Sequence, residues 1–238
     1  MPRASWFLKS VKAITSLQPK ESVKSSADEG TDLDPILVLL RIWQTERLKK
    51  THADFMRSKR YGPACQFFLS DIYAPKDFSQ RDNDIEYLYE VMSSVLPTFL
   101  LSLVSNTVQL NNLSNNLDHQ LLNALVVELG IKDSITPQTY SEAYRICDNY
   151  AERVHQIELL MDIGRQVDIG TRIPLVGTTL RLARGPAHRA GWGEVHDFLE
   201  KGFSAFKKMR GSKKFLNTVK RREIDILDKI FTGDPNPF

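Results

Sequence analysis

The sequence predicts an all-α protein, a compact array of about eight helices forming a single domain behind a disordered N-terminal tail. From Leu33 onward nearly every segment repeats its apolar residues at a helical period, and no run alternates as a strand does. Capping residues and prolines mark several helix starts. The loops between the expected helices are short, which is typical of a compact helical array. We therefore divide the 238 residues into a flexible tail (1–32), a helical domain (33–231) and a C-terminal tail (232–238).

The N-terminal tail is rich in serine and lysine, and residues 20–32 show no periodicity, which predicts disorder. Residues 1–20 carry four basic residues and no acid. With Trp6 and Phe7 they favour at most weak contact with a membrane surface as a basic amphipathic helix. A solvated leader is the simpler interpretation, because one short basic segment binds membranes weakly.

Local signals place each helix in turn. Asp34-Pro35 puts a capping carboxylate before a proline at the first helical position, and Thr136-Pro137 repeats this arrangement. Pro63, Pro97 and other prolines mark further starts or kinks. We expect helices near residues 35–58, 63–73, 80–95, 97–112, 117–130, 137–170 (with a break near Asn149), 174–184 and 193–231 (broken at Gly211).

The clearest apolar stripe runs along the helix expected after residue 193. Its apolar residues fall on one side of the helix and its charged residues on the other, so this side faces the core. Gly202 interrupts the stripe, although glycine costs about 1 kcal/mol relative to alanine inside a helix. We expect another helix to approach closely at Gly202. The stripe consists of Val195, Phe198, Leu199, Gly202, Phe203, Phe206 and Met209.

Several charged residues share helix faces with hydrophobic residues. Arg47 and Asp54 lie on the same face as Trp43, Glu223 lies among the apolar residues of the last helix, and Arg153 and Asp168 share a face of the long helix. Buried charges must be paired, because an isolated buried ion costs several kcal/mol. We favour a structural ion-pair network. The alternative is a polar pocket that binds a small molecule or performs acid–base chemistry.

The segment 67–82 adds charges to this picture, since it joins two expected helices through a short loop that carries both acids and bases. The candidate polar cluster therefore comprises Arg47, Asp54, Asp77, Arg81, Asp82, Arg153, Asp168 and Glu223.

The same segment carries a resemblance to a known family. The run Phe67-Phe68-Leu69, Asp71, Tyr73, Pro75, Asp77-Phe78, Arg81-Asp82 and the later block Asp197-Phe198-Leu199-Glu200 to Phe206 are similar to those of an uncharacterised, all-helical bacterial protein family. The resemblance covers about residues 35–231. It implies an all-helical fold and no particular activity.

Recognised catalytic and cofactor motifs do not occur in the sequence. Glu152-x-x-His155 has the spacing of di-iron bundles, but there is one copy and we expect it to face water. The other histidines lack ligand spacing with one another. We predict no metal and no cofactor, and we expect Cys65 and Cys147 to be small packing residues rather than nucleophiles. The sequence leans against an enzyme and leaves the question open.

Positive charge is concentrated near the C-terminus. Residues 181–222 contain twelve Lys or Arg and three acids, a local net charge of +9, whereas the rest of the chain carries −6. Such asymmetry permits nonspecific nucleic-acid association, although no recognised binding motif accompanies it. The candidate basic surface consists of Lys207, Lys208, Arg210, Lys213, Lys214, Lys220 and Arg221.

Three functions stay open. The first is a cytoplasmic binding or scaffold protein that contacts a protein partner or itself; the cytoplasm follows from two unpaired cysteines, no evident signal peptide and no transmembrane segment. The second is a small-molecule binder or enzyme that uses the candidate polar cluster. The third, and least favoured, is nucleic-acid association through the basic C-terminal part.

Overall fold

The computed structural model describes residues 35–72, 98–189 and 191–238, which form helices and contain no strand. This confirms the all-α prediction for the described part of the chain. Several predictions lie outside the described residues: the tail 1–32, the helix near 80–95, and Asp77, Arg81 and Asp82. Among the helices described, none combines the length and the apolar character needed to cross a bilayer.

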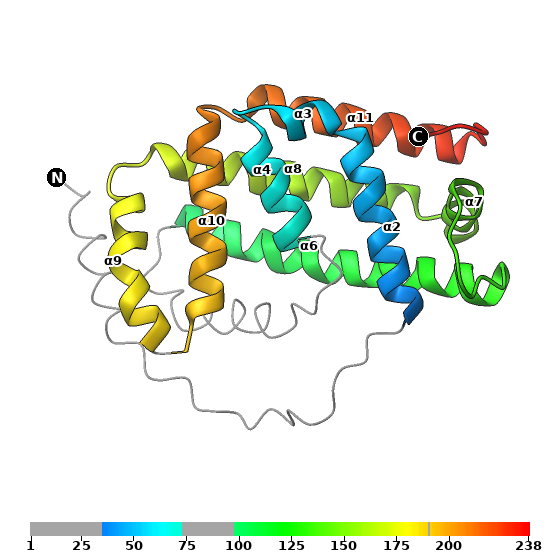
Figure 1. The fold of residues 1–238 in the computed structure, drawn as a ribbon, viewed down its shortest axis with the longest axis horizontal. Coiled ribbons are helices and arrows are strands. Elements are labelled where there is room, and N and C mark those ends of the chain that lie inside the picture. The colour runs from blue at the N-terminus through cyan, green and yellow to red at the C-terminus, as the bar shows by residue number, and fades with distance from the viewer. Residues whose placement is uncertain (1–34, 73–97, 190) are drawn as a thin grey trace.

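The helices pack in two layers (Figure 1). The rear layer holds three long helices that run side by side: α6 (Thr98–Asn123), α8 (Tyr150–Arg172) and α11 (Lys213–Phe231). Helix α8 is central, since it contacts α6, α11 and α10. It therefore connects the two layers.

The front layer crosses the rear one at a steep angle (Figure 1). It consists of α2 (Pro35–Thr51), α3 (Ala53–Arg57), α4 (Gly62–Phe67) and α10 (Gly193–Met209). At opposite ends of the molecule lie α7 (Pro137–Cys147), which packs on α11, and α9 (Val176–Arg189), which packs on α10.

Helix α6 corrects one boundary. We expected two helices, near 97–112 and 117–130. The structure has one helix that ends in a single π-helical turn, Ala124–Glu128. Its apolar face is unbroken, since Leu110, Leu117 and Leu121 are all buried. The asparagines at 112, 115 and 116 face solvent. The continuous helix is therefore stabilised by the apolar face that packs on α8.

Other boundaries were predicted with mixed success. The break near Asn149 is confirmed, and Asp148 adopts a left-handed φ of 46° there. The break at Gly211 is also confirmed. The first predicted helix is interrupted at His52, between α2 and α3. Helix α9 continues through Pro186 to Arg189, beyond the predicted end at 184.

Two apolar clusters form the core. One lies where α2, α6, α7 and the C-terminal half of α11 meet, and the other lies between α3, α4, α8, α10 and the N-terminal half of α11. Leu40 and Tyr140 belong to the first cluster, and Phe55, Phe206 and Phe215 belong to the second. Helix α11 contributes to both, so its middle lies at the junction of the two clusters.

Candidate functional site

A buried polar group occupies that junction. Arg47 of α2 donates a hydrogen bond to the carboxylate of Glu223 on α11. His52 Nε2 lies 2.8 Å from the second oxygen of the same carboxylate. The Arg47 and Glu223 side chains are 14% and 13% exposed. The two side chains are therefore withdrawn from water and paired with each other.

The electrostatics of this pair follow from its burial. Burial by itself raises the pKa of the Glu223 carboxyl, but the charge of Arg47 and the hydrogen bond with His52 outweigh it and lower that pKa to about 2. Burial likewise disfavours the charged guanidinium, yet the Glu223 carboxylate raises the pKa of Arg47 above its ordinary value. Both groups stay ionised at neutral pH.

The other described residues of the candidate polar cluster do not join this pair. Asp54 is exposed and forms a two-pronged ion pair with Arg222, at 2.7 and 2.9 Å. The hydrogen bond from Arg222 lowers the pKa of Asp54 to about 2. Asp168 pairs with Arg172 on the next turn of α8, at 2.6 Å. These acids therefore take partners that the sequence did not single out.

Arg153 is buried without a carboxylate partner among the described residues. It donates a hydrogen bond of 3.1 Å to the Leu117 carbonyl, and its guanidinium lies 4.4 Å from the centre of the Tyr144 ring. The predicted single network is thus divided into separate contacts, of which Asp168–Arg172 lies within α8 and the others join different helices. These contacts are typical of structural interactions between packed helices rather than of one shared polar pocket.

A groove with a volume of about 900 Å³ lies elsewhere, between α9, α10 and the turn that joins α3 to α4. This volume is within the range of ligand-binding pockets. None of the five described residues of the candidate polar cluster lines it. The described residues that border the groove include six cationic side chains, Lys59, Arg60, Arg181, Lys207, Lys208 and Arg210, and one acid, Glu200. We call it the basic groove.

Helix-end chemistry positions part of the basic groove. Arg60 donates a hydrogen bond of 2.6 Å from Nε to the Met209 carbonyl at the end of α10. The last carbonyls of a helix have no partner within it, and cations are favoured there. Arg210 adopts a left-handed φ of 52°, which ends α10. Lys207 and Lys208 in the last turn gain stability from the same helix end.

Helix-end effects do not account for Lys59 and Arg181, and neither of these nor Lys208 has a counter-ion among the described residues. All three side chains are exposed. The single acid is already engaged, since a Glu200 oxygen lies 4.0 Å from both Arg184 and His196. Among the described residues, the basic groove therefore concentrates positive charge that is largely uncompensated.

The sequence identified half of these cations. Lys207, Lys208 and Arg210 of the candidate basic surface line the groove. The remaining four residues of that surface lie on α11 and do not: Lys213, Lys214 and Arg221 are exposed, and Lys220 pairs with Glu158 at 3.1 Å.

Three groove cations were missed: Lys59, Arg60 and Arg181. The run Arg57-Ser58-Lys59-Arg60 was the available signal for two of them. Arg181 was counted in the basic stretch 181–222 but was not selected for the candidate surface.

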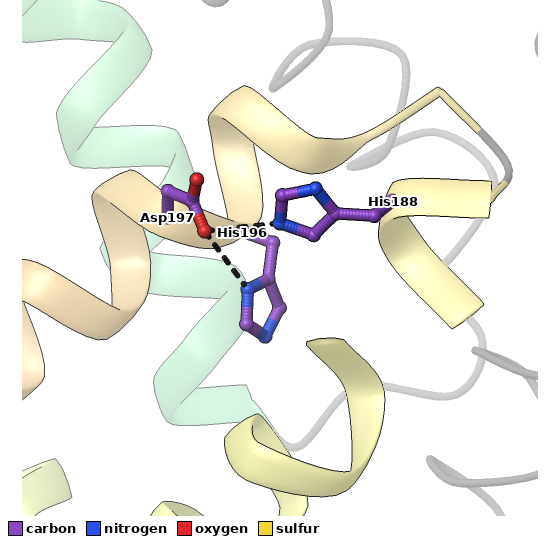
Figure 2. Close-up of side chains that lie close together, drawn as sticks. All are labelled: His188, His196 and Asp197. Atoms are coloured by element: carbon purple, nitrogen blue, oxygen red, sulfur yellow. Dashed lines mark hydrogen bonds and ion pairs between the residues drawn. The ribbon is translucent and has the colours of Figure 1, made fainter. Parts of the chain in front are cut away.

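Histidines also meet in three dimensions. Glu152 and His155 are both exposed, as expected. By contrast, the turn between α9 and α10 brings His188 and His196, which lack ligand spacing in the sequence, to the carboxylate of Asp197 (Figure 2). Their ligand atoms lie within 4.8 Å of one another, close enough to be considered as a metal site. Sequence spacing missed this group because a turn, not one helix, assembles it.

Comparison with known proteins identifies a family. A family model described as a domain of unknown function, DUF8198, matches residues 24–237. No curated protein and no solved structure matches the chain.

Proposed function

Since the chain belongs to DUF8198, a family described as a domain of unknown function, we propose a function from its geometry: a binding protein whose basic groove receives an acidic segment of a protein partner. The observation that carries the proposal is the charge of the groove. Among the described residues that line it, six cationic side chains face one acid in a space of about 900 Å³. Complementary charge of this kind steers association and selects acidic partners.

The apolar part of the groove lining favours a polypeptide, rather than a small inorganic anion, as the ligand of the groove. Leu180 and Phe203 line the groove together with the cations. An acidic segment that also carries an apolar side chain would satisfy both features, because the apolar side chain would be removed from water while its neighbours pair with the cations.

Nucleic acid is the less favoured occupant. Binding of single strands relies on aromatic faces on which bases stack. Of the described residues that line the groove, Phe203 alone is aromatic, and Lys207 Nζ lies 5.7 Å from the centre of its ring. The exposed lysines of α11, which a nucleic-acid track through residues 181–222 would use, do not line the groove.

The test compares two triple variants with the same change in net charge. In the groove variant, Lys59, Arg181 and Lys208 are each changed to Glu. In the control variant, Lys213, Lys214 and Arg221 on α11 are each changed to Glu. Fluorescence anisotropy measures binding of a labelled peptide of Asp, Glu and Leu, of its Asn, Gln and Leu counterpart, and of a single-stranded oligonucleotide.

We expect the groove variant to lose affinity for the acidic peptide by about tenfold or more, and the control variant to lose much less. Wild-type affinity should also fall as salt is added, because exposed charges are screened. Equal losses in the two triple variants would reduce the effect to net charge and contradict the proposal. Tighter binding of the oligonucleotide than of the acidic peptide would favour the nucleic-acid function instead.

A further inference from the structure

The turn between α9 and α10 assembles three potential metal ligands. His188 is in the last turn of α9, and His196 and Asp197 follow one another in the first turns of α10. Asp197 Oδ1 lies 3.0 Å from His188 Nε2 and 3.8 Å from His196 Nδ1. Figure 2 shows both imidazole rings directed at this carboxylate. The three side chains thus converge on one point.

The hydrogen bonding of His196 leaves its Nδ1 available to bind a metal ion. His196 is only 5% exposed, and its Nε2 lies 2.7 Å from the Leu180 carbonyl. A carbonyl only accepts hydrogen bonds, so Nε2 carries the proton and donates it. The neutral ring then presents the lone pair of Nδ1. A backbone carbonyl that fixes the tautomer in this way is the usual outer-shell partner of a metal-bound histidine.

His196 Nδ1 has no hydrogen-bond partner among the residues that the structure describes, although it is buried. The nearest carboxylate oxygens belong to Asp197 and Glu200, at 3.8 and 4.0 Å, which is too long for hydrogen bonds. An unsatisfied buried polar atom costs about 1–3 kcal/mol, and it calls for an explanation. A cation between Nδ1 and the carboxylates would satisfy it.

We propose that His188, His196 and Asp197 bind Zn²⁺, with Glu200 as the fourth ligand. Zn²⁺ accepts imidazole nitrogen and carboxylate oxygen together, whereas Mg²⁺ and Ca²⁺ prefer oxygen ligands alone. In a tetrahedral zinc site the ligand atoms lie about 3.3 Å apart, as bonds of about 2.0–2.1 Å require. The Asp197 oxygen lies 3.0 Å from His188 Nε2 and 3.8 Å from His196 Nδ1, so these three ligands are already near that spacing. A Glu200 oxygen lies 4.0 Å from His196 Nδ1, and the Glu200 side chain would have to move towards the other two ligands to complete the site.

The charges around the site set limits on its affinity. Two carboxylates balance the two positive charges of the ion. Arg184 lies 4.0 Å from Glu200 and competes with the metal for that carboxylate. Of the four proposed ligands, Glu200 lines the basic groove, whereas His188, His196 and Asp197 do not. The metal site therefore does not depend on the proposed function.

Gly193 supplies an independent way to disturb the site. It is the first residue of α10, and a Cβ built on it would lie 2.7 Å from His188 Nδ1. The His188 ring therefore occupies the space that a side chain at 193 would fill. Alanine there is compatible with the helix, and the flexible side chain that must move is His188. Gly193→Ala should displace a ligand without unfolding the protein.

The experiment titrates the chelator-treated full chain with ZnCl₂ by calorimetry and with CoCl₂ by visible absorption, which reports tetrahedral coordination. Wild-type protein should bind a single Zn²⁺ per chain and should give the intense visible bands of tetrahedral Co²⁺. His188→Ala, Asp197→Asn and Gly193→Ala should each lower Zn²⁺ affinity by at least about tenfold. Circular dichroism of each variant verifies that the helices are retained.

His155→Ala is the matched control, because His155 is an exposed histidine on α8, outside the site. It should bind Zn²⁺ as the wild type does. Absence of Zn²⁺ binding by the wild type would overturn the proposal. So would Zn²⁺ affinity that is unchanged in His188→Ala and Asp197→Asn, or that depends on His155. Because acidic peptide binding is measured separately, the metal site and the basic groove succeed or fail independently.

Discussion

At the scale of the residue, the most consequential contact is the buried Arg47–Glu223 pair. It lies at the junction of two apolar clusters, and His52 supports the same carboxylate. A buried ion pair contributes little beyond a well-packed apolar pair, but removal of one partner leaves an uncompensated charge in the interior. The pair therefore makes the junction sensitive to single substitutions.

We expect Glu223→Gln to lower the free energy of unfolding by about 3 kcal/mol, because Arg47 then stays charged and buried without a counter-ion. Urea denaturation followed by circular dichroism measures this change. Asp225→Asn is the control, since Asp225 is exposed on the same helix and pairs with Lys229 at 2.9 Å. The control should cost less than about 1 kcal/mol. Comparable effects of the two substitutions would contradict the assignment.

The same carboxylate predicts an acid-dependent loss of stability. The pKa of Glu223 falls from an ordinary value of 4.5 in the unfolded chain to about 2 in the folded protein. The folded state therefore binds fewer protons, and the stabilisation is present above pH 4.5 and is lost as the pH falls towards 2. Between these limits, the unfolding free energy of the wild type should fall more steeply than that of Glu223→Gln. Parallel curves would show that Glu223 does not titrate in this way.

At the scale of the element, two glycines let helices approach closely. The prediction for Gly202 is confirmed: a Cβ there would lie 2.9 Å from the tip of the Phe67 ring on α4. Gly164 on α8 is tighter, since its Cβ would lie 2.6 Å from a methyl carbon of Leu216 on α11. Phe67 is only partly buried, whereas Leu216 is 2% exposed. The two glycines therefore differ in how easily their neighbours move.

We expect Gly164→Ala to destabilise the protein, because overpacking costs about 1–3 kcal/mol and exceeds the roughly 1 kcal/mol that alanine gains in helix propensity. Gly202→Ala serves as the matched comparison and should be closer to neutral, since the end of the Phe67 side chain moves aside. Thermal and urea unfolding of both variants measures the difference. A larger loss of unfolding free energy in Gly202→Ala than in Gly164→Ala would contradict this prediction.

At the scale of the whole molecule, Cys65 reports on cooperative opening. It lies in the second apolar cluster, where α4 meets α10 and the N-terminal half of α11. Burial raises the pKa of its thiol to about 12, and the charge of Asp54 acts in the same direction. The reactive thiolate is therefore scarce in the folded protein at neutral pH.

We expect Cys65 to react with a thiol reagent only when the packing around it opens, so its labelling rate should rise with urea in step with unfolding. Cys147 is less buried than Cys65 and should react faster. Cys65→Ser and Cys147→Ser variants assign the two phases. Rapid labelling of Cys65 in the native protein would contradict its placement in a closed core.

The sequence alone determined the helical class, the break at Gly211, and the inward direction of Arg47 and Glu223. These properties follow from the helical period and from capping chemistry, which act over a few neighbouring residues. The same reasoning was wrong about α6, where it divided one helix, Thr98–Asn123, into two. Tertiary packing keeps this segment helical, because Leu117 and Leu121 are buried on one face while the polar residues lie on the other.

Only the tertiary structure decided which charges meet. Asp54 forms an ion pair with Arg222. Arg153 has no carboxylate partner among the described residues and instead donates a hydrogen bond to the Leu117 carbonyl. Lys59 and Arg181, which are distant in the sequence, line the same groove. His188 and His196 likewise converge only because the turn between α9 and α10 reverses the chain. Helical period fixes the face on which a side chain lies. The residue opposite that face depends on how the helices cross, which is set by packing between segments far apart in the chain.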